Sequence, residues 1–163
     1  MRSLQKIVMT AAVAVLMVSC SDSGTADETT REDGEDGEVV EAGDVGAFRL
    51  QVGDCLDAAI EGQVNSLPVV PCGEEHTGEV FHLFDLPDGD FPGDDIISAA
   101  AADGCIAAFE GYVGLDFASS RYDISSLNPT QEAWDEIDDR EIVCTLSDVA
   151  GARLTGSAAG SAE

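Results

Sequence analysis

A cysteine and a histidine stand four positions apart in the stretch VVPCGEEHTGEVF (69–81), where Cys72 and His76 precede an apolar run. These residue types can serve three purposes. A free thiolate beside an imidazole is a nucleophile, and the same two groups are ligands that zinc prefers. A cysteine held in a disulfide instead leaves the histidine to hydrogen bond within a loop. The choice depends on the compartment and on the use of the other cysteines.

The N-terminus has the features of an export signal. Arg2 and Lys6 precede an apolar stretch, residues 7–18, that is shorter than the roughly 20 residues needed to span a bilayer. The stretch ends in LMVSC, which resembles a bacterial lipobox. We therefore expect a signal peptide over 1–19, palmitate on Cys20, and a lipid-anchored protein on the extracytoplasmic face of the cell membrane. Cleavage without lipidation and an uncleaved anchor are the alternatives.

Residues 20–47 are predicted to be the lipidated cysteine followed by an acidic, disordered tether. After the cysteine, the segment holds ten acidic residues, one arginine, three valines and no aromatic residue. So few apolar side chains cannot offset the entropy lost on ordering, and like charges extend the chain. The folded domain is then expected over 48–157, and a disordered tail over 158–163.

The charge of the chain excludes several function classes. Beyond the expected signal peptide the chain has five arginines and no lysine against 33 acidic residues. Nucleic acid is excluded as a partner, because its binding depends on Lys and Arg. A lysine Schiff base and a phosphate-loop lysine are excluded as well, and we expect no cofactor. The folded part, about 110 residues long, suits one domain with one core.

Cysteine usage answers the opening question at the level of sequence. With Cys20 lipidated, Cys55, Cys72, Cys105 and Cys144 remain, and four cysteines in an oxidising compartment allow three disulfide connectivities. We predict Cys55–Cys72, because a hairpin-like loop can close their 17-residue separation, and Cys105–Cys144. The second pair is favoured because both cysteines fall on the apolar face of their own helix or strand. No free thiol is then left for catalysis or zinc.

The hydrophobic pattern predicts a small α+β domain, mostly an antiparallel sheet packed by one main helix and one short helix. In the strand from residue 79, Val80, His82 and Phe84 are expected on one face and Phe81 and Leu83 on the other. Pro68 predicts an edge or a bend in its strand. The expected strands are 48–52, 64–70, 79–86, 121–129 and 140–148, and the expected helices are 94–112 and 131–137.

A few side chains remain as site candidates. His76 and Glu79 are possible binding-surface residues, although the main expectation for His76 is a structural hydrogen bond in its loop. Asp88, Asp90 and Asp94 are of the type that binds calcium. They lack the spacing and the distal bidentate glutamate of an EF-hand loop, so helix capping and a solvated turn are expected there and no metal site.

Several separate stretches resemble the septum-formation-related domain of exported or membrane-anchored proteins in high-G+C Gram-positive bacteria. The stretches are VGDCLD (52–57), VVPCGEEHTGEVF (69–81), DLPDGDFPG (85–93), AAFEGYVG (107–114), NPTQEAW (128–134) and IVCTL (142–146). Glu75 departs from the proline that often precedes the histidine, which loosens the turn. The resemblance implies a cell-envelope domain associated with septum formation, and it brings no catalytic residues.

The sequence therefore predicts a membrane-anchored lipoprotein whose non-catalytic domain meets a protein or cell-wall partner in septum formation. Two alternatives stay open. One is a lipoprotein that binds a small ligand or a divalent cation through the acidic loop 85–95. The other is an enzyme acting on wall polymers with Glu79 or Asp123 as its acids, which is weak because any chain this acidic contains paired carboxylates.

Overall fold

The computed structural model describes residues 30–31, 37–58 and 64–163. The expected signal peptide, Cys20 and much of the expected tether lie outside these ranges. The strands are β1 (Thr30–Arg31), β2 (Val39–Glu41), β3 (Gly43–Gly46), β4 (Cys55–Leu56), β5 (Ser66–Val70), β6 (Gly78–Asp85), β7 (Tyr122–Leu127) and β8 (Glu141–Asp148). The helices are α1 (Asp94–Val113), α2 (Gln131–Glu136) and the 3-10 turns η1 (Ala47–Arg49) and η2 (Phe117–Ser119).

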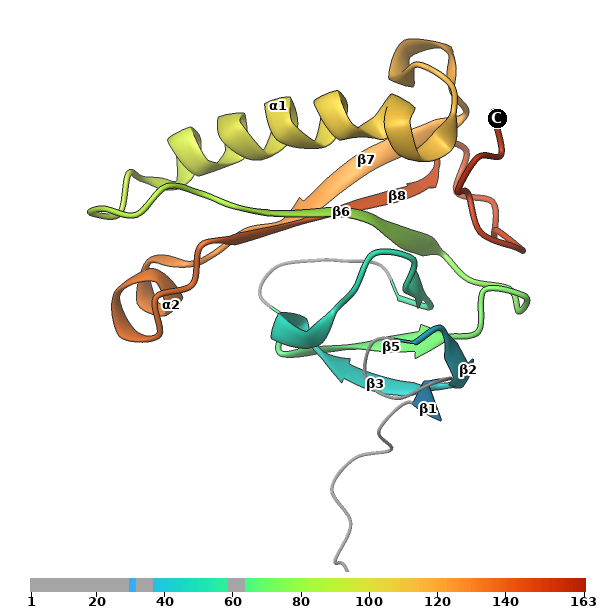
Figure 1. Cartoon of the computed structure of the whole chain (residues 1–163), viewed down its shortest axis with the longest axis horizontal. Coiled ribbons are helices and arrows are strands. Elements are labelled where there is room, and N and C mark those ends of the chain that lie inside the picture. Colours follow the sequence, from blue (N-terminus) through green and yellow to red (C-terminus); the bar gives the residue numbers. More distant parts are fainter. Residues whose placement is uncertain (1–29, 32–36, 59–63) are drawn as a thin grey trace, which may run out of the picture.

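Six strands form one antiparallel sheet in the order β3-β5-β4-β6-β8-β7. The long helix α1 packs along β6, β8 and β7, and the short helix α2 lies at the far end of β7 and β8 (Figure 1). The predicted class, an antiparallel sheet packed by one main and one short helix, is confirmed.

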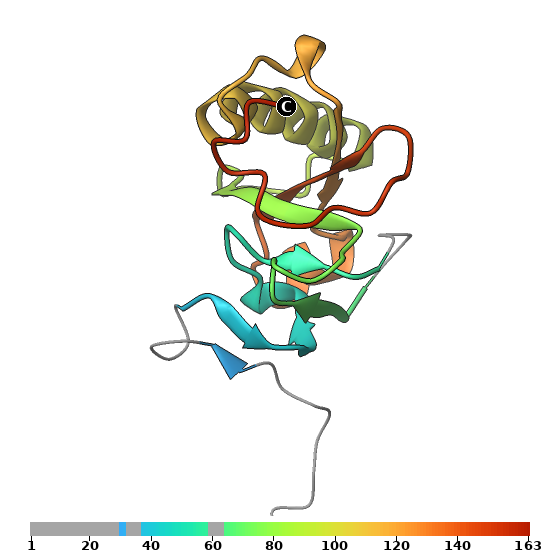
Figure 2. The ribbon, with the colours of Figure 1, turned by 90° about the vertical axis from the view of Figure 1, so that its right-hand side faces the viewer.

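The sheet separates two apolar clusters. On the α1 side, Phe81 and Ile142 pack with Phe109 of the helix. On the other side, Val80 and Val143 pack with side chains of β3 and β5, among them Leu67. Both views place α1 above β6 and place β3 and β5 below it (Figures 1 and 2). The six-stranded sheet therefore curls, so that its β3–β5 part and α1 lie on opposite sides of β6.

One face of α1 packs on the sheet. The buried residues of α1 recur every four positions, the spacing of one helical face: Ile97, Ala101, Cys105, Phe109 and Val113. Gly93 is the N-cap of α1 and no side chain caps the helix, so the expectation that Asp94 caps it is wrong. Asp94 and Asp95 lie in the first turn instead, where their negative charge interacts favourably with the helix dipole. Among the described helices, α1 has a length and composition compatible with a membrane span. The core helix of a soluble domain has the same properties.

Both predicted disulfides are confirmed. Cys55 and Cys72 join β4 to the end of β5 with a Cα–Cα distance of 5.3 Å. Cys105 and Cys144 join α1 to β8 with a Cα–Cα distance of 5.5 Å. Both separations are in the normal range for a bridge, so the second one fixes the helix directly on the sheet.

The side chains of the central strand β6 alternate differently from the prediction. The register against β8 shifts between Val80 and His82, which is a β-bulge at Phe81. Because the bulge adds one residue, alternation restarts and Phe84 joins the α1 side while Val80 lies on the opposite side. The prediction that Val80 shares a face with Phe84 is therefore wrong, and so is the prediction that Phe81 shares a face with Leu83.

Two predictions about the early strands are also wrong. The stretch from Phe48 to Val52 is not a strand: η1 turns the chain, Leu50 is buried, and Phe48 and Val52 are exposed. Of the two expectations for Pro68, an edge or a bend, the edge is wrong, since β5 lies between β3 and β4. The proline is tolerated because β4 is two residues long and pairs only with Val69 and Val70, beyond the proline.

The folded part extends past both predicted boundaries. β2 and β3 lie within the segment predicted to be a tether, and Val39 and Val45 are buried there. The acidic edge strand β3 is ordered because β5 supplies its hydrogen-bond partners. The predicted tail also differs, because Ala158 is buried and the amide of Ala162 donates to the carbonyl of Val113.

Candidate functional site

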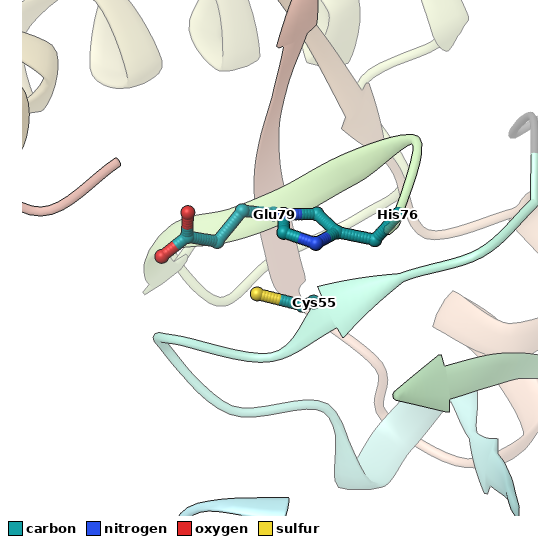
Figure 3. A group of neighbouring side chains, drawn as sticks. All are labelled: Cys55, His76 and Glu79. Atoms are coloured by element: carbon teal, nitrogen blue, oxygen red, sulfur yellow. The ribbon is translucent and has the colours of Figure 1, made fainter. Parts of the chain in front are cut away.

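A buried cluster contains the histidine that opened the sequence question. The cluster consists of Cys55 in β4, His76 just before β6, and Glu79 in β6 (Figure 3). Their potential metal-ligand atoms lie within 4.8 Å of one another, and all three residues are fully buried. His76 and Glu79 therefore do not form a binding surface, which corrects the prediction. The prediction was wrong because both side chains are polar, and polar residues are more often exposed than buried.

The cluster does not offer a zinc site in its oxidised state. The sulfur of Cys55 is bonded to Cys72, so it provides no thiolate. His76 and Glu79 alone fall short of the three or four ligands that zinc takes. The imidazole Nδ1 lies 2.9 Å from the carbonyl oxygen of Glu74, which agrees with the expected structural hydrogen bond in this loop.

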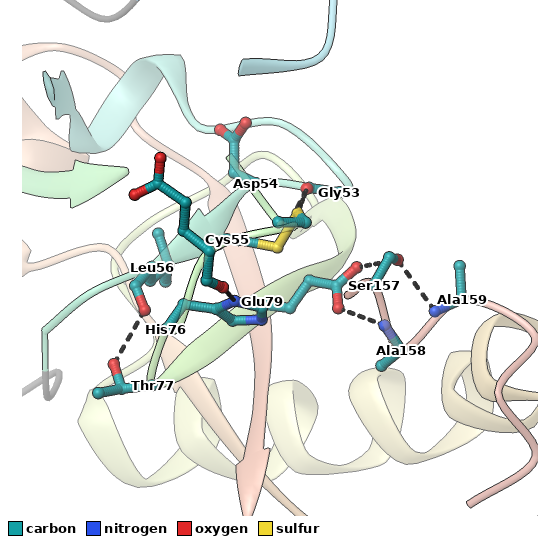
Figure 4. Close-up of a disulfide and its surroundings, with 12 residues drawn as sticks. Gly53, Asp54, Cys55, Leu56, His76, Thr77, Glu79, Ser157, Ala158 and Ala159 are labelled. Atoms are coloured by element: carbon teal, nitrogen blue, oxygen red, sulfur yellow. Dashed lines mark hydrogen bonds between the residues drawn. A yellow bond between two sulfur atoms is a disulfide. The ribbon is translucent and has the colours of Figure 1, made fainter. Parts of the chain in front are cut away.

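Glu79 is the acceptor for three donors from distant parts of the chain. Figure 4 shows two of them, Ser157 and Ala158. Tyr112 donates its hydroxyl at 2.6 Å, Ser157 donates its hydroxyl at 2.5 Å, and Ala158 donates its amide at 2.6 Å. Burial, together with the adjacent Glu79 carboxylate, raises the pKa of Tyr112 well above its usual range. The phenol therefore stays protonated and remains a donor at any physiological pH.

The loop VVPCGEEHTGEV thus serves to hold the C-terminal segment (149–163). His76 and Leu154 exchange backbone hydrogen bonds of 3.1 and 2.9 Å, and the amide of Gly156 donates to the carbonyl of Cys72 at 2.6 Å. With the Glu79 contacts, these bonds attach the segment to β6 and to the end of α1. The residues that looked reactive in the sequence are structural in this fold.

The other sequence candidates lie elsewhere. His82 is half-buried, as expected, and stacks on Phe84 with ring centroids 5.6 Å apart. Asp88 and Asp90 are exposed in the turn before α1, and Asp94 is exposed in its first turn. Among the described residues they form no close group of three metal-ligand side chains.

A second site, missed by the sequence reasoning, lies on the face of β7 and β8 that α1 does not cover. A hollow of about 500 Å³ opens there, with Leu127 and Val143 among its lining residues. We call it the α2 groove, because α2 lines it together with η1 and the residues that precede β5. Its lining residues are 47–48, 64–65, 126–128, Thr130, 132–133, 136–137, Asp139, Glu141 and Val143.

The α2 groove is both apolar and acidic. Phe48 is 62 % exposed and Ile137 is 60 % exposed, large values for apolar side chains of this size. Among the described residues, four acidic side chains and no lysine or arginine line the same hollow: Glu132, Glu136, Asp139 and Glu141. A half-apolar hollow with a few polar groups is the usual form of a binding site.

A smaller hollow of about 350 Å³ adjoins the groove, and the two share Phe48, Asp139 and Glu141. Asp85 also lines the smaller hollow and pairs directly with Glu141 across β6 and β8. Partial burial, with the nearby carboxylates of Asp85 and Asp139, raises the pKa of Glu141. The fold therefore concentrates like charges at this end of the sheet.

Arg140 and Trp134 hold the groove in shape. Trp134 is buried, and its indole nitrogen donates to the carbonyl of Gly89 at 2.8 Å. The guanidinium of Arg140 lies 3.7 Å from the centroid of the Trp134 ring and pairs with Asp138 at 2.8 Å. Arg140, the basic residue that lines the smaller hollow, is thus already engaged in structural contacts.

Comparison with known proteins identifies the family of this domain. The sequence model of a family described as "Septum formation" matches residues 39–163. The chain belongs to the Septum formation family. The match begins at β2, within the segment that composition alone had given to the tether, and it includes the C-terminal segment. The family match therefore covers the six-stranded sheet, both α-helices and the C-terminal segment.

Two relatives of this Septum formation domain are described as uncharacterized membrane proteins of Mycobacterium tuberculosis, from strains CDC 1551 and H37Rv. Each is 31 % identical over 110 residues, which is 60 % of this chain and 24 % of the relative. The aligned region thus spans about a quarter of these relatives. No solved structure matches the chain.

Proposed function

We propose that this chain is a septum-related membrane protein that binds a partner through the α2 groove. Its domain lies on the extracytoplasmic face of the cell membrane, is attached by lipid at Cys20, and does not catalyse a reaction. The partner is another envelope protein or a cell-wall component. Membership of the Septum formation family and the description of its relatives as membrane proteins support the setting.

Disulfide chemistry supports the extracytoplasmic location. Two bridges hold this small domain together, and such bridges persist in oxidising compartments. The same chemistry supports a binding role over an enzymatic one. Cys72 is bonded to Cys55, and Glu79 is enclosed by its three donors, so none of these groups meets a substrate.

The α2 groove is the observation that carries the proposal. Phe48 and Ile137 expose apolar surface beside a hollow large enough for several side chains. Exposed apolar residues that cluster at a hollow mark interaction sites more often than scattered ones do. The cost of exposing them to water is removed when a partner covers them.

Photo-crosslinking in intact cells tests this role. A photoreactive amino acid at position 48 or 137 should form one discrete adduct, and the same amino acid at Ile106 or Val149 should form none. These controls are also exposed apolar residues, and they lie on α1 and after β8, away from the groove. Equal crosslinking from all four positions would remove the groove from the proposal.

Anchoring and the division role need separate tests. Cys20→Ser should release the protein from the membrane fraction, whereas the unchanged chain should stay in that fraction and be degraded by protease added to intact spheroplasts. A tagged chain should gather at septa. Uniform distribution of the tagged chain, with normal septa in a deletion strain, would contradict the link to septum formation.

A further inference from the structure

The chemistry of the α2 groove specifies what kind of partner fits it, an inference that rests on the function proposed above. Seven acidic side chains line the groove and the hollow beside it: Asp85, Asp88, Glu132, Glu136, Asp138, Asp139 and Glu141. In the part of the chain that the structure describes, Arg140 is the one basic residue that lines either hollow, and it is held by Trp134 and by Asp138. The surface that a partner meets is therefore strongly negative.

This arrangement works against the stability of the free domain. Asp85 and Glu141 are opposite each other in the β6–β8 register, and like charges in that position repel. Asp139 lies close enough to Glu141 to add to the repulsion. A positive group placed in the hollow reverses the sign of these interactions, so binding a cation relieves a repulsion that folding creates.

Charge also decides among the possible occupants. A second copy of the chain has a net charge of −26 and would be repelled. The chain's own residues 21–36, which precede β2, include seven acidic residues and one arginine, so this segment would be repelled too. A metal ion alone fits poorly, since Phe48, Leu127 and Ile137 supply no oxygen ligands from their side chains.

We infer that the α2 groove binds a short lysine- or arginine-bearing segment of a partner protein. The positive side chains of the segment lie against Glu136, Asp139 and Glu141, and its apolar side chains cover Phe48 and Ile137. Complementary charge around an apolar centre is the usual arrangement of a specific protein interface.

Two synthetic peptides test the inference with the folded, disulfide-bonded chain. One alternates lysine with leucine, and its twin has glutamate in place of every lysine. The lysine peptide should bind in 150 mM salt, with NMR shifts concentrated on the groove residues, and the glutamate twin should not. At this salt concentration charges farther than about 8 Å away are screened, so the groove acids must supply the attraction.

Matched variants separate the groove from general charge. Glu136→Gln with Glu141→Gln should weaken the lysine peptide about tenfold, because two close charge contacts are lost. Asp103→Asn with Glu110→Gln removes two charges from the exposed side of α1 and should change binding less than twofold. Equal weakening by both pairs, equal binding of the glutamate twin, or no binding of the lysine peptide would each overturn the inference. Calcium alone producing the same shifts would overturn it as well.

The cellular crosslink distinguishes this inference from the function on which it rests. A discrete adduct from position 48 that survives Glu136→Gln with Glu141→Gln would leave the groove as a binding site and reject a cationic partner. Loss of the adduct with these substitutions, together with its retention in the Asp103→Asn, Glu110→Gln variant, is the expected result.

Discussion

The hydroxyl of Tyr112 on α1 donates a hydrogen bond of 2.6 Å to Oε1 of Glu79 in β6, although 33 residues separate them in the chain. The same oxygen accepts the hydroxyl of Ser157, and the other carboxylate oxygen accepts the amide of Ala158. One buried carboxylate therefore connects the central strand, the main helix and the C-terminal segment.

Glu79→Ala should destabilise the domain by about 3 kcal/mol, because three donors lose their acceptor in a buried place. Tyr112→Phe removes one of the three bonds and should cost about 1 kcal/mol. Urea unfolding measures both, and faster hydrogen exchange at the Ala158 amide should accompany the first. Glu110→Ala changes an exposed acid on α1 and is the control. A Glu79→Ala variant as stable as this control would contradict the role of the carboxylate.

Each disulfide should stabilise the domain separately. Cys105→Ala with Cys144→Ala opens a loop with a sequence separation of 39 and should cost about 4 kcal/mol. Cys55→Ala with Cys72→Ala opens one with a separation of 17 and should cost about 3 kcal/mol. Denaturant unfolding compares the two variants with the oxidised chain. Mass spectrometry of an unreduced digest should recover both linked peptides, and an alkylatable thiol at Cys72 or Cys144 in native protein would be inconsistent with them.

Gly78→Ala should be strongly destabilising. A Cβ at this position would lie 2.8 Å from the carbonyl oxygen of Leu146, which belongs to the backbone of β8 and has little freedom to move. Overpacking of this kind costs about 2 kcal/mol. Gly73→Ala is the control, because a Cβ there meets no heavy atom within 4 Å. Thermal melting should separate the two variants, and similar melting temperatures would show that β6 and β8 adjust more easily than their close pairing implies.

Glu141→Gln should stabilise the domain at neutral pH by about 0.5 kcal/mol, since it removes a like-charge pair across two strands. The folded-state pKa of Glu141 is raised, chiefly by partial burial and then by Asp85 and Asp139. The ionised carboxylate therefore destabilises the folded state increasingly as the pH rises through its ordinary pKa to the raised one. At lower pH both states are protonated, so the advantage of the variant should disappear.

Urea unfolding of the unchanged chain and the variant at neutral and acid pH measures this difference. Glu132→Gln is the control. Glu132 is an exposed acid that lines the same groove, and it does not belong to the cross-strand pair of Asp85 and Glu141. A constant advantage of Glu141→Gln at every pH would mean that packing, rather than charge, produces it.

Much of the fold could be predicted because it depends on local pattern. The apolar spacing of 94–112 predicted α1, and the alternation in 140–148 predicted β8, each with few residues of error. The two disulfides followed from the apolar faces on which Cys105 and Cys144 fall and from the short separation of Cys55 and Cys72. These features depend on residues that are close together in the sequence, so one sequence is enough to predict them.

The errors occurred where a distant segment decides the outcome. The bulge at Phe81 is set by the register against β8, and β3 is ordered because β5 pairs with it. Residues 158–163 were predicted to be a tail because their partners, Glu79 and Val113, come from far earlier in the chain. Small residues at such positions show no periodic pattern that would predict ordering.

By itself, the sequence determined the class of fold and the pairing of the cysteines, since these depend on composition and spacing. Only the tertiary structure decided which polar residues are enclosed and which are accessible. It encloses His76 and Glu79, and it gathers Phe48, Glu136 and Glu141 from three separate elements into one groove. The physical reason is that burial and surface charge density depend on which segments pack together, and the antiparallel sheet brings together residues that are far apart in the chain.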